Sequence, residues 1–324
     1  METTRLGMTD LQVSPIAFGT WQLGGEWGQF DEHEAIAAIR HARELGINLF
    51  DTAQAYGFGV SERLLGRALG DELNHHRDDV VIATKGGLRM TEDGMVRDSS
   101  ASWLRSGVEQ SLRSLGVDHI DLYQVHWPDP DVPLAVTAGA LQELVDEGKI
   151  RHAGVSNYST TEMAAFARAR PVETLQPAYH LFRREIEDDI VPYVLEHDIG
   201  VLIYGPLAHG LLGGAMDEHT TFADDDWRGQ SPLFRGKVFR RNLQTVQELG
   251  RFARERDRTV SQLAIAWTLA NPAVDVAIVG ARRATHIEDS VGAADFELSG
   301  DDLREIERIM DGAVTVAGPS PESV

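Results

Sequence analysis

Four side chains that can carry protons lie at or just beyond the ends of three successive apolar segments. Asp51, Lys85 and His126 each end one segment, and Tyr56 follows five residues after Asp51. A tyrosine, whose reference pKa is about 10, is a poor acid or base at neutral pH until a nearby cation favours its phenolate form. Lys85 could supply that charge, and Asp51 could hold the ammonium in place. His126 could then orient a carbonyl oxygen or relay a proton.

Each of these residues also has an ordinary structural explanation when it is taken alone. Asp51 could cap a turn, Lys85 could be a surface lysine with a buried stem, and His126 could be a hydrogen-bonded core histidine. The four together are harder to explain in this way, because perturbed ionisable groups gather at functional sites. The set therefore favours proton chemistry at Tyr56, provided that the fold brings the segment ends together.

The apolar segments alternate with amphipathic stretches along most of the chain. They are short and nearly all apolar, as in parallel strands that are covered on both faces. Eight strand–helix units predict an α/β fold, a (β/α)8 TIM barrel, whose strands end together at one face. A doubly wound nucleotide-binding fold is disfavoured, because no Gly-x-Gly-x-x-Gly motif follows a strand. The expected strands are residues 47–51, 80–85, 120–126, 151–156, 173–176, 201–204, 276–279 and 296–298.

Three parts of the chain lie outside these units. Residues 5–16 alternate apolar and polar and predict an N-terminal β-hairpin that covers one end of the barrel. Residues 205–237, after the sixth expected strand, are too many for an ordinary loop and predict a long lid or binding loop, with a disordered insertion as the alternative. We expect a single barrel domain over residues 1–312 and a flexible C-terminal tail over residues 313–324.

Composition and charge exclude several kinds of partner. The 324 residues include 51 acidic and 30 basic ones, and the net charge of −21 opposes binding to nucleic acid or to anionic membranes. No apolar run reaches about 18 residues and no signal peptide opens the chain, so we expect a cytoplasmic protein. The chain has no cysteine and no histidine spacing typical of zinc helices, so no metal is expected. The oligomeric state stays open.

An ordered set of motifs runs through most of the chain. The motifs are Phe50-Asp51-Thr52-Ala53, Tyr56-Gly57, Gly59-x-Ser61-Glu62, Thr84-Lys85, Gln124-Val125-His126, Gly154-Val155-Ser156-Asn157, Gln176, Tyr204-Gly205-Pro206-Leu207 and Gly280-Ala281-Arg282-Arg283. With these motifs the chain resembles the aldo-keto reductase family from about residue 5 to residue 310. The resemblance is to the general bacterial branch, which is similar to the potassium-channel β-subunit-like branch. It implies a barrel that uses NADPH to reduce aldehydes and ketones, with Tyr56 as general acid, Lys85 and Asp51 tuning it, and His126 orienting the substrate carbonyl.

The resemblance also implies a site for NADP(H), with NAD(H) less favoured. Ser156, Asn157 and Gln176 would hold the nicotinamide carboxamide, and Tyr204 would stack on the ring. An aromatic face suits a flat amide ring, and guanidinium suits a 2′-phosphate. The other expected contacts are Thr20, Trp21 and Asp51, the pyrophosphate cradle Gly205, Pro206, Leu207 and Ala208 with Lys237 or Arg235 as clamp, and Gly280, Arg282, His286, Asp289 and Ser290 at the adenosine end.

Some residues at these positions depart from the family pattern. Glutamine, asparagine and serine are common where this chain has His286, Ser290 and Gly205. These changes leave the adenine contacts open, and with them the choice between NADPH and NADH, although Arg282 and Arg283 favour a 2′-phosphate.

The substrate is weakly defined by the sequence. Trp21, Phe58 and Trp127 are expected to line an apolar pocket, although Trp21 and Trp127 could equally be packing residues. Such a pocket would suit small aldehydes, α-dicarbonyls, sugars and terpenoids alike.

Two other functions remain as alternatives. The first is a nicotinamide-binding regulatory subunit that senses redox state with little turnover. The second is a barrel isomerase or aldolase with Lys85 as a Schiff-base lysine, which would leave the cofactor motifs without a role. The complete set of four proton-carrying residues favours the reductase.

Overall fold

Eight parallel strands form a closed barrel. The computed structural model describes residues 1–25, 28, 30–223 and 226–316. The barrel strands follow one another in chain order, and the last pairs with the first through Ile278 and Ala17. They are β3 (Ile16–Gly19), β4 (Leu49–Asp51), β5 (Val81–Gly86), β8 (Ile120–Val125), β9 (Ile150–Ser156), β10 (Thr174–Gln176), β11 (Gly200–Tyr204) and β12 (Val276–Gly280).

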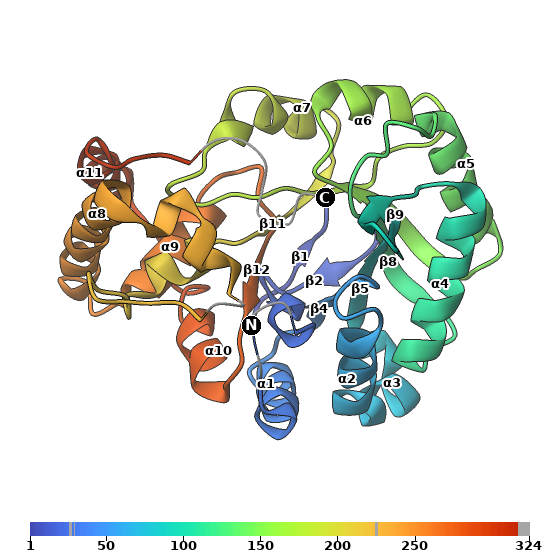
Figure 1. Cartoon of the computed structure of the whole chain (residues 1–324), viewed down its shortest axis with the longest axis horizontal. Helices are drawn as coiled ribbons and strands as arrows, with labels where there is room; N and C mark the ends of the chain where they lie inside the picture. Colours follow the sequence, from blue (N-terminus) through green and yellow to red (C-terminus); the bar gives the residue numbers. More distant parts are fainter. Residues whose placement is uncertain (26–27, 29, 224–225, 317–324) are drawn as a thin grey trace.

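The helices form an outer ring around these strands (Figure 1). Local sequence defines many of their first turns: Ser159, Thr259 and Ser299 each form a capping box with the third residue of the helix that follows. The helices are α1 (Glu32–Glu44), α2 (Val60–Ala68), α3 (Gly70–His75), α4 (Ala101–Leu115), α5 (Leu134–Asp146), α6 (Thr160–Phe166), α7 (Ile190–Glu196), α8 (Gly236–Arg254), α9 (Val260–Leu269), α10 (Ala284–Val291) and α11 (Gly300–Met310). The predicted (β/α)8 barrel is confirmed.

One of the eight predicted strands is wrong and one barrel strand was missed. Residues 296–298 are not a strand: they lie between α10 and α11, where half-buried Phe296 and Leu298 pack against the hydrophobic core on either side of an exposed Glu297. The first barrel strand is instead β3, which is fully buried between β12 and β4. Consequently, the long stretch from residue 205 follows the seventh strand, and Ser156 ends the fifth.

The predicted N-terminal hairpin is present as β1 (Thr4–Arg5) and β2 (Gln12–Val13). Its residues Leu6, Leu11 and Val13 are buried against residues of the barrel strands such as Leu49 and Leu202. The hairpin therefore closes the end of the barrel where the strands begin. A second hairpin, β6 (Leu88–Thr91) and β7 (Gly94–Arg97), extends the loop after β5 and was not predicted.

Two further expectations are revised. The stretch from residue 205 contains the short 3₁₀ segments η4 (Ala208–Gly213), η5 (Trp227–Gln230) and η6 (Pro232–Phe234), and α8 already begins at Gly236. The expected flexible tail is wrong for residues 313–316, because Val314 and Asn242 exchange two hydrogen bonds and the Val316 amide donates to the Phe182 carbonyl. It stays a prediction for 317–324, which lie outside the described residues. No helix in the described part of the chain is long and apolar enough to cross a membrane.

A histidine on β9 links the hairpin to the bottom of the barrel. The two ring nitrogens of His152 lie 2.6 Å from Glu173 Oε1 and 2.8 Å from Asp10 Oδ1, which belongs to the loop of the hairpin. Burial alone lowers the pKa of His152, but the hydrogen bonds to both carboxylates outweigh it and the pKa is raised. Protonated His152 therefore fastens the hairpin.

We expect His152→Gln to lower the free energy of unfolding by about 1–2 kcal/mol at pH 6 and by less at pH 9. The raised pKa means that the stabilisation is complete below the ordinary histidine pKa and is lost as pH rises through the higher folded value. Urea unfolding at several pH values measures this, with the exposed His33→Gln as control. The same cost at both pH values would contradict the interpretation.

Candidate active site

The four proton-carrying residues meet at the carboxyl ends of adjacent strands. Asp51 ends β4, Lys85 lies near the end of β5, His126 follows β8, and Tyr56 lies in the loop after β4. Lys85 Nζ is 2.7 Å from Asp51 Oδ1 and 3.4 Å from the Tyr56 hydroxyl. The rings of Tyr56 and His126 meet edge to face with centroids 5.7 Å apart. The arrangement that the sequence predicted is therefore present.

The buried ammonium of Lys85 uses all three of its donor directions. Besides Asp51 and Tyr56, it donates to the Thr52 carbonyl at 2.9 Å. The side chains of Lys85 and Asp51 are 1% and 4% exposed, so water does not screen the pair. The second Asp51 oxygen, Oδ2, accepts from Gln176 Nε2 at 2.9 Å. Gln176 is on β10, directly across the barrel from β4, so this bond spans the barrel mouth.

His126 is held as a neutral side chain. Burial, and secondarily the positive charge of Lys85, keep the pKa of His126 well below its usual range. Its Nδ1 atom is buried without a hydrogen-bond partner among the described residues. A neutral imidazole beside Tyr56 can donate one hydrogen bond to an oxygen without competing with the phenol for a proton.

Buried hydroxyls position the loop that carries Asp51 and Tyr56. Ser61 Oγ, at the start of α2, lies 2.6 Å from Thr20 Oγ1 and 3.1 Å from Thr52 Oγ1. Thr84 donates to Glu62, which is fully buried and whose pKa is raised by burial. The Ser61-Glu62 pair of the sequence motif thus fastens the ends of β3, β4 and β5 to one another.

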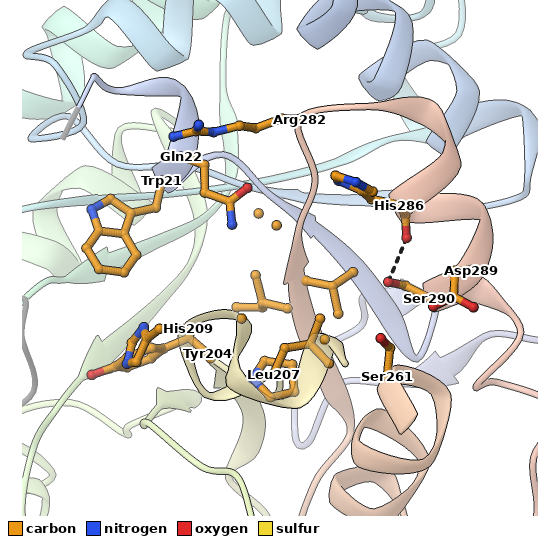
Figure 2. A pocket seen from close by; sticks show the side chains of 18 of the residues that line it. Trp21, Gln22, Tyr204, Leu207, His209, Ser261, Arg282, His286, Asp289 and Ser290 are labelled. Carbon is orange, nitrogen blue, oxygen red and sulfur yellow. Dashed lines mark hydrogen bonds between the residues drawn. The ribbon is translucent and has the colours of Figure 1, made fainter. Parts of the chain in front are cut away.

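A cavity of about 480 Å³ adjoins these residues and is lined by Asp51, Tyr56 and Gln176 among others. This volume is within the range of small-molecule and cofactor sites. Figure 2 shows the side chain of Trp21 near His209 and Tyr204 on one side of the cavity, and His286, Asp289 and Ser290 on the other. One side is therefore aromatic and the other polar.

Most of the predicted cofactor residues are brought to this cavity or next to it. The residues predicted for the carboxamide are positioned by hydrogen bonds: Ser156 donates to the Gln176 carbonyl, and Asn157 accepts from the Tyr204 hydroxyl at 2.9 Å. Asp289 accepts from Thr259 at the start of α9. The predicted residues that line the cavity are Trp21, Asp51, Gln176, Tyr204, Gly205, Pro206, Leu207, Gly280, Arg282, His286, Asp289 and Ser290.

Other predicted residues are not in the lining of this cavity. Thr20 is fully buried in the hydroxyl network, and Ala208 is buried at the start of η4. Lys237 is exposed in the first turn of α8. Phe58, predicted for the substrate pocket, is half-buried in the same loop as Tyr56, while Trp127 lines a second cavity.

Several lining residues were missed by the sequence interpretation. Arg228 lies in the wall and contacts Asp226 at 2.6 Å and the His209 carbonyl at 3.2 Å. His209 also lines the cavity, and its ring meets Trp227 edge on next to the stacked rings of Trp21 and Trp227, whose centroids are 6.3 Å apart. The aspartate, aromatic and arginine residues among residues 205–237 could have indicated a binding loop. Local sequence pattern could not predict which of them line the cavity. Gln22, Met216, Ser261 and Thr285 are further examples.

No metal centre is present among the described residues, where no group of three or more histidines and carboxylates is placed to hold an ion.

We expect Lys85→Met to lower the free energy of unfolding by about 3–5 kcal/mol, because it leaves the Asp51 carboxylate buried without its cation. Adding Asp51→Asn should recover part of this loss by removing the uncompensated charge. Urea unfolding of the two single variants and the double variant measures the coupling. Lys149→Met, which breaks ion pairs with Glu109 and Glu147 near the surface, is the matched control and should cost about 1 kcal/mol or less. Equal losses for the two lysine variants would contradict the expectation.

A closed barrel with a buried tyrosine, lysine, aspartate and histidine at the carboxyl ends of its strands, beside a cavity, is the architecture of a barrel enzyme. The chain belongs to the aldo/keto reductase family, whose model matches residues 15–311, and is therefore an oxidoreductase. It is 41% identical over 317 residues to the aldo-keto reductase YhdN of Bacillus subtilis, covering 97% of this chain and 95% of that protein.

Solved structures agree with this assignment. The glycerol dehydrogenase AKR11B4 of Gluconobacter oxydans is 37% identical, with a TM-score of 0.89 and 99% coverage of both chains. An aldo/keto reductase of Klebsiella pneumoniae, solved in complex with NADP and acetate, is 29% identical, with a TM-score of 0.74 and 98% coverage of both chains.

Proposed function

We propose that the protein reduces aldehydes and ketones to alcohols with NADPH, and that Tyr56 is the general acid. The observation that carries the proposal is the position of Lys85. Its ammonium lies within hydrogen-bond distance of the Tyr56 hydroxyl and the Asp51 carboxylate, beside a cavity large enough for a cofactor. A fixed cation next to a phenol makes the phenol a better acid, because it stabilises the phenolate that remains after proton transfer.

The residues divide the work of carbonyl reduction. The nicotinamide supplies a hydride to the carbonyl carbon when the cofactor is bound. Tyr56 donates its proton to the carbonyl oxygen, which completes the alcohol, and Lys85 stabilises the phenolate until it is reprotonated from solvent. Neutral His126 donates a hydrogen bond that orients the carbonyl oxygen. Asp51, fixed on both oxygens by Lys85 and Gln176, keeps the ammonium aimed at Tyr56.

The cavity fits the cofactor chemically. Tyr204 and Trp21 offer aromatic faces for the nicotinamide, and Asn157 and Gln176 lie close by with amide groups. Arg282 lines the cavity near Arg228; burial, and then the charge of Arg228, lower the pKa of Arg282. Both guanidinium groups line the cavity, so a bound anion such as a phosphate of the cofactor would stabilise them. The Klebsiella pneumoniae relatives, which were solved in complex with NADP or NADPH, support the same cofactor here.

We expect Tyr56→Phe to lower kcat with NADPH and 4-nitrobenzaldehyde by about 100-fold or more, the range of a lost general acid. Binding of NADPH, followed by quenching of its fluorescence, should be unchanged. Turnover equal to the unsubstituted protein would remove Tyr56 from its assigned role. A protein that binds NADPH but reduces no carbonyl in a broad panel would instead favour the regulatory function.

We expect Arg282→Gln to lower kcat/KM for NADPH about tenfold and to change the value for NADH much less, because a charge-assisted contact to the 2′-phosphate is lost. Steady-state kinetics with the two cofactors measure the ratio. Arg283→Gln is the control, since Arg283 is mostly exposed and pairs with Glu34. An equal loss with both cofactors would place Arg282 at the pyrophosphate instead.

A further inference from the structure

One buried carboxyl group behind the candidate active site has no charged partner. Five carboxyl groups are buried in the described part of the chain, and four of them are held by cations or backbone amides. The partners are Lys85 for Asp51, Arg77 and Arg151 for Asp121, Arg228 for Asp226, and the amides of Ser99 and Asp131 for Asp129. The fifth, Glu62, is fully buried, and among the described residues neither a cation nor a backbone amide donates to it. A carboxyl group in such surroundings is more stable as the neutral acid than as the anion.

The neighbours of Glu62 are hydroxyl groups from two other elements. Its Oε1 atom accepts from Thr84 Oγ1 of β5 at 2.8 Å, and Ser111 of α4 is the second hydroxyl close to the carboxyl. Glu62 Oε2 and Ser111 Oγ are both buried, and neither atom has a hydrogen-bond partner in the part of the chain that the structure describes. A proton on Oε2 lets the acid donate to Ser111 while Oε1 still accepts from Thr84.

The charges around Glu62 do not compensate a carboxylate. Burial is the largest effect and raises its pKa, while Arg63, the next residue of α2, lowers it from an exposed position. Tyr123 of β8 stays neutral beside it, because burial and then the charge of Glu62 raise the pKa of this phenol. Lys85 follows Thr84 on β5, but successive side chains of a strand point to opposite faces, so the ammonium lies inside the barrel with Asp51.

The bond between Glu62 and Thr84 bears on the position of Lys85. Thr84 directly precedes Lys85, so the bond fixes the end of β5 to α2, whose Ser61 also holds Thr52 in the loop after β4. Lys85 Nζ reaches the Tyr56 hydroxyl at 3.4 Å, which is near the limit of a hydrogen bond. A small shift of this strand end would therefore separate the ammonium from the phenol.

We propose that Glu62 is a positioning residue for Lys85, that it acts as a neutral acid, and that its ionisation weakens the site as pH rises. The neutral acid joins Thr84 of β5 to Ser111 of α4. The anion leaves an uncompensated charge buried between the strand and the helices, which loosens this connection. The effect on turnover rests on the proposed carbonyl reduction, whereas the protonation of Glu62 does not.

Unfolding at two pH values tests the neutral acid. Glu62→Gln keeps an acceptor for Thr84 and a donor for Ser111 but cannot ionise. Because the pKa of Glu62 is higher in the folded than in the unfolded chain, its stabilisation is complete below the ordinary carboxyl pKa and is lost as pH rises to the folded value. The urea midpoint of Glu62→Gln should therefore exceed that of the unsubstituted protein by more at pH 8 than at pH 5.

Glu173→Gln is the matched control for the unfolding experiment. Glu173 pairs with Arg170 and His152, so the same substitution should lower the urea midpoint at pH 8. A midpoint of Glu62→Gln below that of the unsubstituted protein at pH 8, or an equal difference at pH 5 and pH 8, would overturn the proposal.

Turnover separates a positioning role from a purely structural one. With NADPH and 4-nitrobenzaldehyde, Glu62→Gln should match the kcat of the unsubstituted protein within about twofold at pH 6 and should lose less of it at pH 9. Glu62→Leu, which offers Thr84 no acceptor, should lower kcat about tenfold at both pH values and leave KM for NADPH unchanged. If the leucine variant does not fold, Glu62→Gln decides alone. The same fractional loss of kcat between pH 6 and pH 9 in Glu62→Gln and in the unsubstituted protein would overturn the proposal.

Infrared spectroscopy detects the proton directly and needs no substrate. At pH 5 the unsubstituted protein should show a C=O stretching band of a protonated carboxyl group that Glu62→Gln lacks, and the band should decrease as pH rises. No such difference between the two proteins would overturn the neutral acid. A protein that shows the band but reduces no carbonyl would contradict the proposed reductase function and leave the protonation of Glu62 supported.

Discussion

The ion pair between Lys85 and Asp51 is the interaction on which the rest of the site depends. Both side chains are almost completely buried, and removing two charges from water costs several kcal/mol for each. The barrel offsets that cost with hydrogen bonds from separate elements, the Thr52 carbonyl on one side and the Gln176 amide on the other. The closed barrel supplies these bonds because it makes the ends of β4, β5 and β10 face one another.

The segments that follow the strands turn this charged centre into a site. The stretch after β11 runs over the large cavity and brings His209 and Trp227 against Trp21. Ala208 and His209 adopt left-handed backbone conformations, with φ of 47° and 55°, which cost about 1 kcal/mol or more each outside glycine. Such strain persists only where surrounding contacts impose it. The aromatic stack and the Arg228 bond to the His209 carbonyl supply these contacts.

Local pattern predicted much of the fold but could not distinguish every strand. The strand Ile16–Gly19 was missed because Ile16 was assigned to the predicted hairpin over residues 5–16 and the next three residues to no element. Residues 296–298 imitate a strand with two apolar residues around a charge. The spacing of apolar residues predicts which side chains are buried, but it does not distinguish a barrel strand from a loop that packs on helices. Phe296 is half-buried against the same hydrophobic core in which Phe18 is completely buried, and both look alike in the pattern of apolar residues. The predicted number of barrel strands, eight, was correct because the one wrong strand and the one missed strand cancelled.

The sequence by itself determined the alternation of strands and helices, the hairpin, and the four proton-carrying residues. Each of these features depends on residues that lie close together in the sequence. Tertiary structure alone decided which distant groups meet: the bond from Gln176 to Asp51 across the barrel, Arg228 at the large cavity, and Arg183 at the second. The physical reason is range. Propensity and periodicity act over a few residues, whereas these contacts join segments that only the closure of the barrel brings within hydrogen-bond distance.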